Sequence, residues 1–216
     1  MIAPPERSPE RDAALEAMLP NVPFDGWTYR ALRGGLASIG VAREEAELLF
    51  PGGAADMIEA FCDRADRRMA QAAAEQLKEA ALGARVRAAV ALRFAQNRPY
   101  KEAVRRAVAI LALPRNVRLA ATCTMRTVDA IWHAAGDRST DFSWYTKRGV
   151  LTVVYSATLL FWLRDSSEDD AATLAFLDRR MAGIAWTHRL RGRADAMLHR
   201  VTSLAKREGP AREAGG

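Results

Sequence analysis

Residues that build catalytic and metal sites are scarce in this sequence. Its 216 residues include two cysteines and three histidines, and Cys62 and Cys123 lack the CxxC spacing of a zinc site. We therefore expect both to be reduced thiols in the core of a cytosolic protein. His133, His188 and His199 are scattered, and HExxH, GxSxG, P-loop and GxGxxG motifs are missing. The sequence thus argues against an enzyme and indicates neither a metal nor a cofactor.

Long hydrophobic runs are missing as well. The uncharged segment 149–163 has 15 residues, whereas a membrane-spanning helix needs about 20. We expect it to form a helix that is buried on all sides or that lines an apolar cavity. The first residues, MIAPPERSPE, are polar and rich in proline. They predict a disordered tail over residues 1–8, and neither a signal peptide nor a mitochondrial transit segment. A bacterial, cytoplasmic protein is therefore expected.

What remains is typical of an all-α protein, because alanine, leucine and arginine dominate and β-branched residues other than valine are sparse. Asp25 is expected to cap the second helix, and the acidic run 166–170 the ninth. We divide the chain into an N-terminal head (9–70), a C-terminal domain (71–190) and a terminal helix with its tail (191–216). Apolar spacing and breaks at glycine and proline predict nine to ten helices: 9–19, 27–39, 41–50, 54–82, 83–99, 100–113, 114–136, 149–163, 174–188 and 193–206.

Residues 10–69 resemble the small helical head of TetR-type repressors, with a short helix between a GV and an FP dipeptide and a long helix after it. In such a repressor the short helix enters the major groove, but here it carries Glu44, Glu45 and Glu47. Over residues 25–68 eight acidic side chains stand against six basic ones, which opposes the phosphate contacts that give DNA affinity. We expect a TetR-like fold that has lost DNA binding. A TetR-type transcriptional regulator with a hydrophobic ligand pocket is the alternative.

The positive charge gathers near the C-terminus. Between residues 188 and 207 six basic side chains stand against the single acid Asp195, in a chain of net charge +6. A basic helix with one apolar stripe can lie in the headgroup region of an anionic membrane. The same stripe could instead dock the helix on the core. The residues expected to reach a membrane are Met197, Leu198, Arg200, Val201 and Leu204.

The centre of the chain resembles the ubiquinone-biosynthesis accessory protein family Coq nine. The block 141–148 (DFSWYTKR), the apolar helix after it and the turn 164–167 (RDSS) follow that family's pattern. Trp132 and the segment 176–184 (FLDRRMAGI) match it as well. The head matches less tightly, although the similarity extends over nearly the whole chain.

This resemblance implies a function. Members have a TetR-like fold without DNA binding, tend to form homodimers, and bind lipids, including isoprenoid quinone intermediates and phospholipids. They support the hydroxylase that acts on demethoxyubiquinone, and a terminal amphipathic helix brings them to the membrane, here the inner face of a bacterial plasma membrane. A surface patch carries the contact with the hydroxylase. Carried over to this sequence, the patch comprises Trp144 and Tyr145 with Ile131, Asp141 and Arg148.

An apolar pocket is expected between the helices 114–136 and 149–163. A run of small side chains beside large aromatics leaves room there, and a polyprenyl tail gains about 0.8 kcal/mol per buried CH₂. We therefore predict a non-catalytic protein that holds a quinone precursor and presents it to a hydroxylase at the membrane. The candidate lining residues are Val128 and Trp132 from the first helix and Leu151, Val154, Thr158, Phe161 and Trp162 from the second.

Overall fold

The computed structural model describes residues 3–76, 80–137 and 143–183. All regular structure in these ranges is helical, which confirms the all-α prediction; the helix expected over 193–206 lies outside them. The 3-10 turns η1 (Arg98–Tyr100), η2 (Pro114–Asn116) and η3 (Glu168–Asp170) precede α7, α8 and the last described helix. In chain order the α-helices are α1 (Pro9–Met18), α2 (Val22–Asp25), α3 (Tyr29–Ser38), α4 (Glu45–Leu49), α5 (Gly53–Gln76), α6 (Leu82–Asn97), α7 (Lys101–Leu111), α8 (Val117–Ala134), α9 (Ser143–Trp162) and a helix over residues 171–183.

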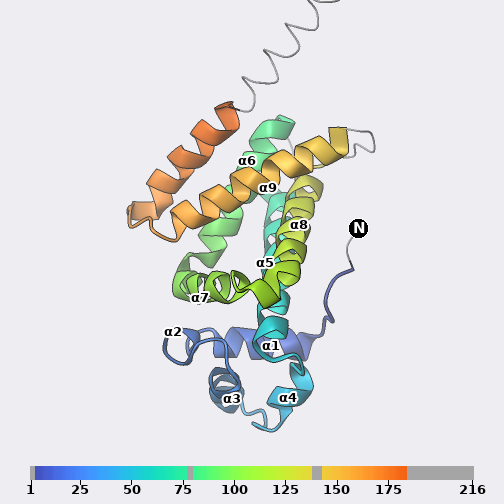
Figure 1. Cartoon of the computed structure of the whole chain (residues 1–216), viewed down its shortest axis with the longest axis vertical. Coiled ribbons are helices and arrows are strands. Elements are labelled where there is room, and N and C mark those ends of the chain that lie inside the picture. Colours follow the sequence, from blue (N-terminus) through green and yellow to red (C-terminus); the bar gives the residue numbers. More distant parts are fainter. Residues whose placement is uncertain (1–2, 77–79, 138–142, 184–216) are drawn as a thin grey trace, which may run out of the picture.

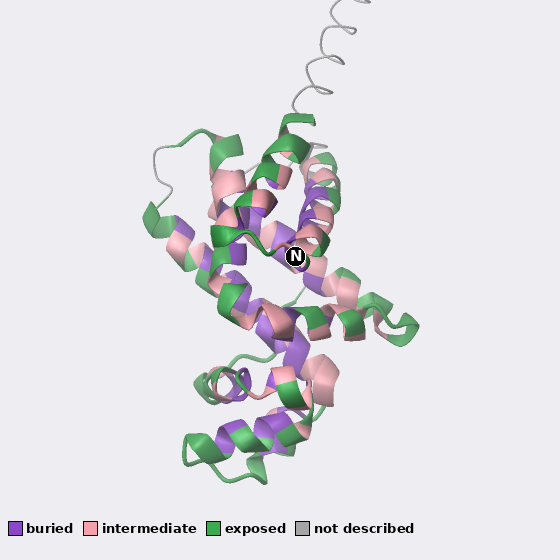
Figure 2. Ribbon diagram, turned by 90° about the vertical axis from the view of Figure 1, so that its left-hand side faces the viewer, coloured by how far each residue is buried: buried purple, intermediate pink, exposed green. Residues whose placement is uncertain are grey.

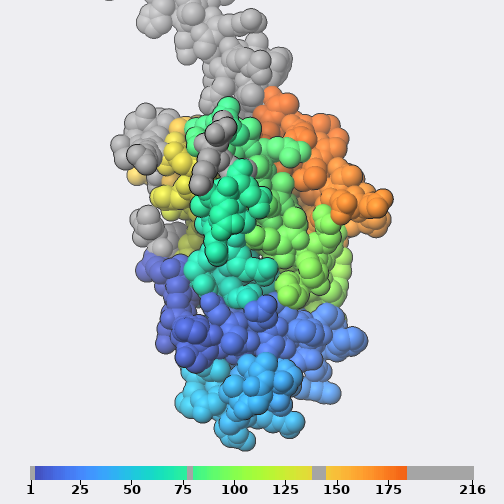
Figure 3. Space-filling model, turned by 180° about the vertical axis from the view of Figure 1, so that it is seen from behind, coloured from blue at the N-terminus to red at the C-terminus, as the bar shows by residue number. Residues whose placement is uncertain are grey.

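The helices form a head and a body that share one long helix. α1 to α4 make the head at one end of the molecule, and α6 to α9 with the helix 171–183 make the body at the other (Figure 1). α5 starts in the head, crosses into the body and packs along α8 over most of its length (Figure 1). Seen from behind, the head lies directly against the body (Figure 3).

The segment before α1 packs on the molecule, so the prediction of a disordered tail is wrong for residues 3–8. The Arg7 guanidinium donates two hydrogen bonds to the Asp63 carboxylate of α5, at 2.9 and 2.6 Å. Ser8 caps the first turn of α1 with its hydroxyl, and Arg126 of α8 donates to a backbone carbonyl of the segment. We call residues 3–8 the N-terminal strap. Its polar, proline-rich sequence gives no sign of these partners, because they come from distant helices.

Two helix caps differ in their agreement with the sequence. Asp25 was predicted to cap the helix after it, but Thr28 does so: its Oγ1 accepts the backbone N–H of Ala31 at 3.3 Å. Asp25 instead ends the short helix α2, in a segment predicted to be a turn. The run 166–170 was predicted to cap the helix 171–183, and Ser167 of that run accepts the backbone N–H of Ala172 with its Oγ at 3.0 Å. The carboxylate that accepts backbone N–H groups there is Asp165, which precedes the run: it accepts those of Ser167 and Thr173, both at 2.8 Å.

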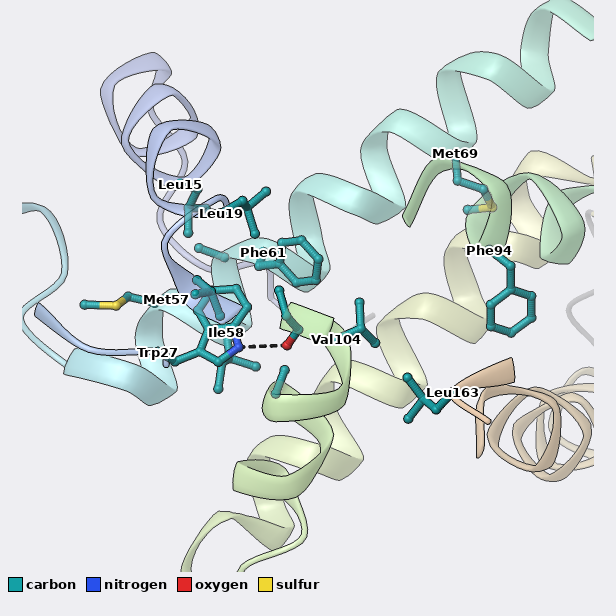
Figure 4. Packing of buried hydrophobic residues seen from close by; sticks show 14 of the residues in the cluster. Leu15, Leu19, Trp27, Met57, Ile58, Phe61, Met69, Phe94, Val104 and Leu163 are labelled. Atoms are coloured by element: carbon teal, nitrogen blue, oxygen red, sulfur yellow. Dashed lines mark hydrogen bonds between the residues drawn. The ribbon is translucent and has the colours of Figure 1, made fainter. Parts of the chain in front are cut away.

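Trp27 joins the head to the body. Its side chain is 2 % exposed, and its indole Nε1 donates to the backbone carbonyl of Ala103 in α7 at 2.9 Å. The ring lies 5.3 Å from the ring of Phe61 on α5. Met57 and Ile58 of the same helix lie around it (Figure 4). A buried indole N–H needs an acceptor, so this bond fixes α7 against the head.

Gly35 allows α3 to cross α1 in close contact. A Cβ atom at this position would lie 2.6 Å from the backbone nitrogen of Met18 and 2.8 Å from the carbonyl oxygen of Ala17. Both atoms belong to the backbone of α1 and cannot rotate away. The crossing therefore depends on glycine at residue 35.

α9 is buried along one face only, so the prediction of a helix buried on all sides is wrong. Leu151, Thr158 and Trp162 point into the core, whereas Val153 and Leu160 are 69 % and 57 % exposed. Figure 2 shows how buried and exposed positions alternate along the helices. Because the exposed positions of α9 also carry apolar side chains, its hydrophobic pattern cannot distinguish the two faces.

An ion pair lies inside the body, at the junction of α5, α6 and α8. Arg93 Nε of α6 lies 2.8 Å from Asp66 Oδ1 of α5, and both side chains are less than one-tenth exposed. The Thr127 hydroxyl of α8 donates to Asp66 Oδ2 at 3.0 Å. Burial raises the pKa of the Asp66 carboxyl to about 6, against the lowering effects of the Arg93 cation and the Thr127 hydroxyl. Asp66 is thus still ionised at pH 7, where it holds three helices together.

Gly35→Ala should destabilise the fold, because the added methyl group collides with the backbone of α1. We expect a loss of about 1–3 kcal/mol in the free energy of unfolding, measured by thermal unfolding followed by circular dichroism. Gly149→Ala is the matched control: nothing lies near its Cβ position in the middle of α9, so it should gain up to about 1 kcal/mol. Equal stability of the two variants would contradict the close crossing.

Asp66→Ala should cost about 3–5 kcal/mol at pH 7, because it leaves the Arg93 cation buried without its partner. Urea unfolding measures the loss, and the double variant Asp66→Leu/Arg93→Met should recover most of it. The wild type should also gain stability relative to the double variant as the pH falls from 7 to 5. The folded Asp66, with its raised pKa, then binds a proton that the unfolded chain does not. A loss below about 1 kcal/mol for Asp66→Ala would show that the pair is not needed.

Candidate functional site

The seven candidate lining residues belong to α8 and α9, and those near the end of α9 contact other helices: Trp162 lies against Phe94 of α6, and Phe161 against Phe176 of the helix 171–183. Val128, Thr158 and Trp162 have no exposed surface, and Leu151 and Val154 are 4 % and 5 % exposed. Spacing of three and four residues places Leu151, Val154, Thr158 and Trp162 on one side of α9. The hydrophobic core includes Val128, Leu151, Val154 and Trp162, and also Phe94 and Leu163, which Figure 4 labels.

Aromatic rings from α6 and from the helix 171–183 pack on the second half of α9. Phe94 of α6 stacks on Tyr155 at a centroid distance of 5.8 Å and lies 5.3 Å from Trp162. Near the end of α9, Phe161 stacks on Phe176 of the helix 171–183 at 4.6 Å. The indole Nε1 of Trp162 is buried and has no hydrogen-bond acceptor among the described residues. The indole Nε1 of Trp132 on α8 is a second such donor, so the apolar side chains lie beside two unused donors.

The structure also has a polar cavity that the sequence did not indicate. It measures about 390 Å³ and lies between the N-terminal strap, α5 and α8, with Arg148 of α9 at one side. Among the residues predicted to bind a ligand or a partner, Arg148 alone lines it. Eight of the cavity's twelve lining residues have ionisable side chains, although most of the accessible surface of the cavity comes from apolar atoms. The lining residues are Pro4, Arg7, Asp63, Asp66, Arg67, Ala70, Met125, Arg126, Asp129, Ala130, His133 and Arg148.

Two residues predicted to lie in the surface patch are buried. Ile131 has no exposed surface, and Arg148 is 3 % exposed. The guanidinium of Arg148 binds Asp129 of α8, with Nη2 and Nε at 2.6 and 2.8 Å from Oδ1. Arg148 thus joins α8 to α9, and the prediction that these two side chains are accessible to a partner is wrong. From the sequence, a charged residue such as Arg148 is expected at the surface. The partner that allows it to be buried, Asp129, lies on another helix and cannot be recognised from the local sequence.

Tyr145 lies on the surface as predicted, with its side chain 70 % exposed in the first turn of α9. Trp144 is also in this turn, but its side chain lies outside the described residues, as does Asp141. Close by, Lys147 Nζ lies 3.1 Å from Asp137 Oδ1 and 5.7 Å from the centroid of the Trp132 ring. The start of α9 thus places an exposed aromatic side chain beside a basic one.

The five residues predicted to reach a membrane, 197, 198, 200, 201 and 204, lie outside the described residues. No described helix is long and apolar enough to cross a membrane. Among the described residues no group of histidine, cysteine, aspartate and glutamate side chains is placed to hold a metal ion. His133 is on the surface, where its Nδ1 lies 2.8 Å from the carbonyl oxygen of Asp129.

The helix that would read DNA in a repressor is short and acidic. α4 has five residues, and Glu44, Glu45 and Glu47 around it are exposed. Glu47 forms an ion pair with Arg33 of α3. One of the few cations on this side of the head is therefore already paired with a carboxylate. The surface thus carries the charge that opposes binding to phosphates.

Comparison with solved structures agrees with the arrangement of the helices. The TetR transcriptional regulator from Nitrosomonas europaea ATCC 19718 superposes with a TM-score of 0.67 and covers 83 % of this chain and 99 % of its own. The two sequences are 24 % identical, so the likeness establishes a TetR-like fold and nothing about DNA or ligands.

Comparison with known sequences identifies the family. The model of the COQ9 family matches residues 117–188, which include α8 and α9. The ubiquinone biosynthesis protein COQ9, mitochondrial, of Rattus norvegicus is 37 % identical over 175 residues, 77 % of this chain and 56 % of that protein. Its Homo sapiens counterpart is 35 % identical over the same share of this chain, and that of Drosophila melanogaster 30 % over 88 %. The chain spans a little over half the length of these relatives. It belongs to the COQ9 family.

Proposed function

We infer that this chain is a non-catalytic accessory protein of ubiquinone biosynthesis. It binds isoprenoid quinone precursors and phospholipids, and it presents the quinone precursor to the demethoxyubiquinone hydroxylase at a membrane surface. The names of its relatives, ubiquinone biosynthesis proteins, supply the pathway. The chain has a TetR-like fold. Its α4 is acidic, however, and this argues against the alternative, a DNA-binding regulator.

The observation that carries the lipid-binding part is the apolar face of α9, which packs on α8 and α6. Its apolar and aromatic side chains suit an isoprenoid tail, which gains free energy by leaving water. The buried N–H groups of Trp132 and Trp162 have no acceptor among the described residues, and a quinone oxygen is a suitable one. In this structure the side chains pack against one another, so a ligand would enter by moving α9 away from these helices.

The start of α9 supports the contact with the hydroxylase. Exposed aromatic side chains are favoured anchors in protein interfaces, and Tyr145 is one. We place Trp144 and Asp141 in the same contact. Ile131 and Arg148 hold α9 in position from inside, since both are buried. The hydroxylase would then bind within reach of the α8–α9 interface.

Two further features belong to the same proposal. The apolar face of α9 that contains Val153 and Leu160 is exposed, and a second copy of the chain in a homodimer would cover it. The basic segment with Met197, Leu198, Arg200, Val201 and Leu204 would bind the headgroups of anionic lipids. Both steps would hold the lipid site close to the membrane that supplies its ligand.

A long-tailed quinone should bind at least tenfold more tightly than a water-soluble, short-tailed one. Each added isoprene unit buries several carbons, at about 0.8 kcal/mol per CH₂. Native mass spectrometry and tryptophan fluorescence titration measure both affinities. Trp162→Phe tests the contact with the quinone headgroup. It keeps an aromatic ring, smaller than the indole, but removes the N–H. It should weaken quinone binding about two- to tenfold without affecting a phospholipid. Equal affinity for the short and long tails would exclude binding driven by the tail.

Tyr145→Lys should abolish capture of the hydroxylase in a pull-down while leaving the thermal unfolding temperature unchanged, because the side chain is exposed. Val117→Lys is the control, since it adds the same charge at an exposed apolar position at the start of α8. It should keep the hydroxylase. Wild-type capture by Tyr145→Lys would remove the start of α9 from the interface.

A further inference from the structure

The two cysteines of the chain face each other across the body. Cys62 is on α5 and Cys123 on α8, and both are free thiols. These helices run side by side in the same direction (Figure 1). One turn further along each helix, the Thr127 hydroxyl reaches the Asp66 carboxylate at 3.0 Å. Residues 62 and 66, and residues 123 and 127, share a face of their helices, so the same register brings the two thiols together.

The surroundings give the two thiols different chemistry. Cys62 is partly exposed, whereas Cys123 is 5 % exposed. A hydrogen bond from the Cys123 thiol lowers the pKa of Cys62, with help from the nearby Arg93 cation and against the effect of burial. The same interaction, together with burial, raises the pKa of Cys123. Arg93 also reaches the backbone carbonyl of Cys62 at 3.5 Å. Cys62 is therefore the thiol that can form a thiolate and attack, and Cys123 is its protonated neighbour.

We propose that Cys62 and Cys123 form a redox modification site, which a low-molecular-weight disulfide such as oxidised glutathione converts to an intramolecular disulfide. The Cys62 thiolate attacks one sulfur of the oxidant and expels a thiolate, which leaves a mixed disulfide on Cys62. Cys123 then loses its proton to solvent and attacks Cys62 Sγ, and a second thiolate leaves. Two electrons pass from the protein to the oxidant, whose two halves end as thiols. The site does not depend on the proposed role in lipid binding.

The bond would fix the longest helix contact in the body. It would close a loop from residue 62 to residue 123, which contains α6 and α7. Closing such a loop restricts the unfolded chain far more than the folded one. It would also prevent α8 from moving away from α5, while α9 stays free to separate from α8.

The test uses the full-length protein in glutathione buffers of increasing oxidation, followed by alkylation and mass spectrometry. We expect both thiols to disappear together, a peptide in which Cys62 is linked to Cys123, and a rise in the unfolding temperature on the order of 10 °C. Dithiothreitol should reverse all three. Thiols that stay free in excess oxidised glutathione, or a crosslink between two chains instead of within one, would overturn the proposal.

Single variants separate the roles of the two thiols. Cys123→Ser should accumulate a mixed disulfide on Cys62, because the attacking thiol remains and the second one is gone. Cys62→Ser should react much more slowly, since Cys123 is buried and protonated. Equal rates for the two variants would contradict the assignment of Cys62 as the nucleophile. The wild-type thiol count decides whether the site exists even if a variant does not fold.

Discussion

The body of this protein is organised around one buried charge. Asp66 meets Arg93 and Thr127 in the interior, and each of the three comes from a different helix. A charge in a medium of low polarity is costly unless its partners are correctly placed. Sliding α6 or α8 along α5 by one turn would leave Asp66 without them. The pair thus selects one register among the many that apolar side chains alone would allow, and the positions of α8 and α9 follow from it.

α8 separates two environments that differ in polarity. Val128 and Ile131 lie in the apolar core on one side, and Arg126 and Asp129 line the polar cavity under the N-terminal strap on the other. Arg148 connects them, because it arises from α9 and ends at Asp129.

Most helices could be predicted because glycine, proline and apolar spacing mark them in the sequence. The long helix was expected to reach residue 82. It is described as far as Gln76, and residues 80 and 81 are not helical, although no glycine or proline between 54 and 82 marks a break. Charged contacts between distant segments left no local pattern: Arg7 with Asp63 and Arg148 with Asp129 are examples. Periodicity places Leu151, Val154, Thr158 and Trp162 on the buried face of α9, whereas Phe161 contacts Phe176 of the helix 171–183. The dense packing of these side chains could not be predicted. The spacing of residues indicates which way the side chains point from a helix, but not how much space remains between them.

The bond from Trp27 to the carbonyl of Ala103 has a mechanical consequence. A repressor that senses a ligand in its body must pass a displacement to its reading head, and that requires a joint that can move. Here the joint is closed by a buried hydrogen bond and a tryptophan packed on Phe61. Bending it would expose an indole and leave a donor without an acceptor. This contact therefore resists turning of the head relative to the body, so that the head serves as a base under the body and not as a lever.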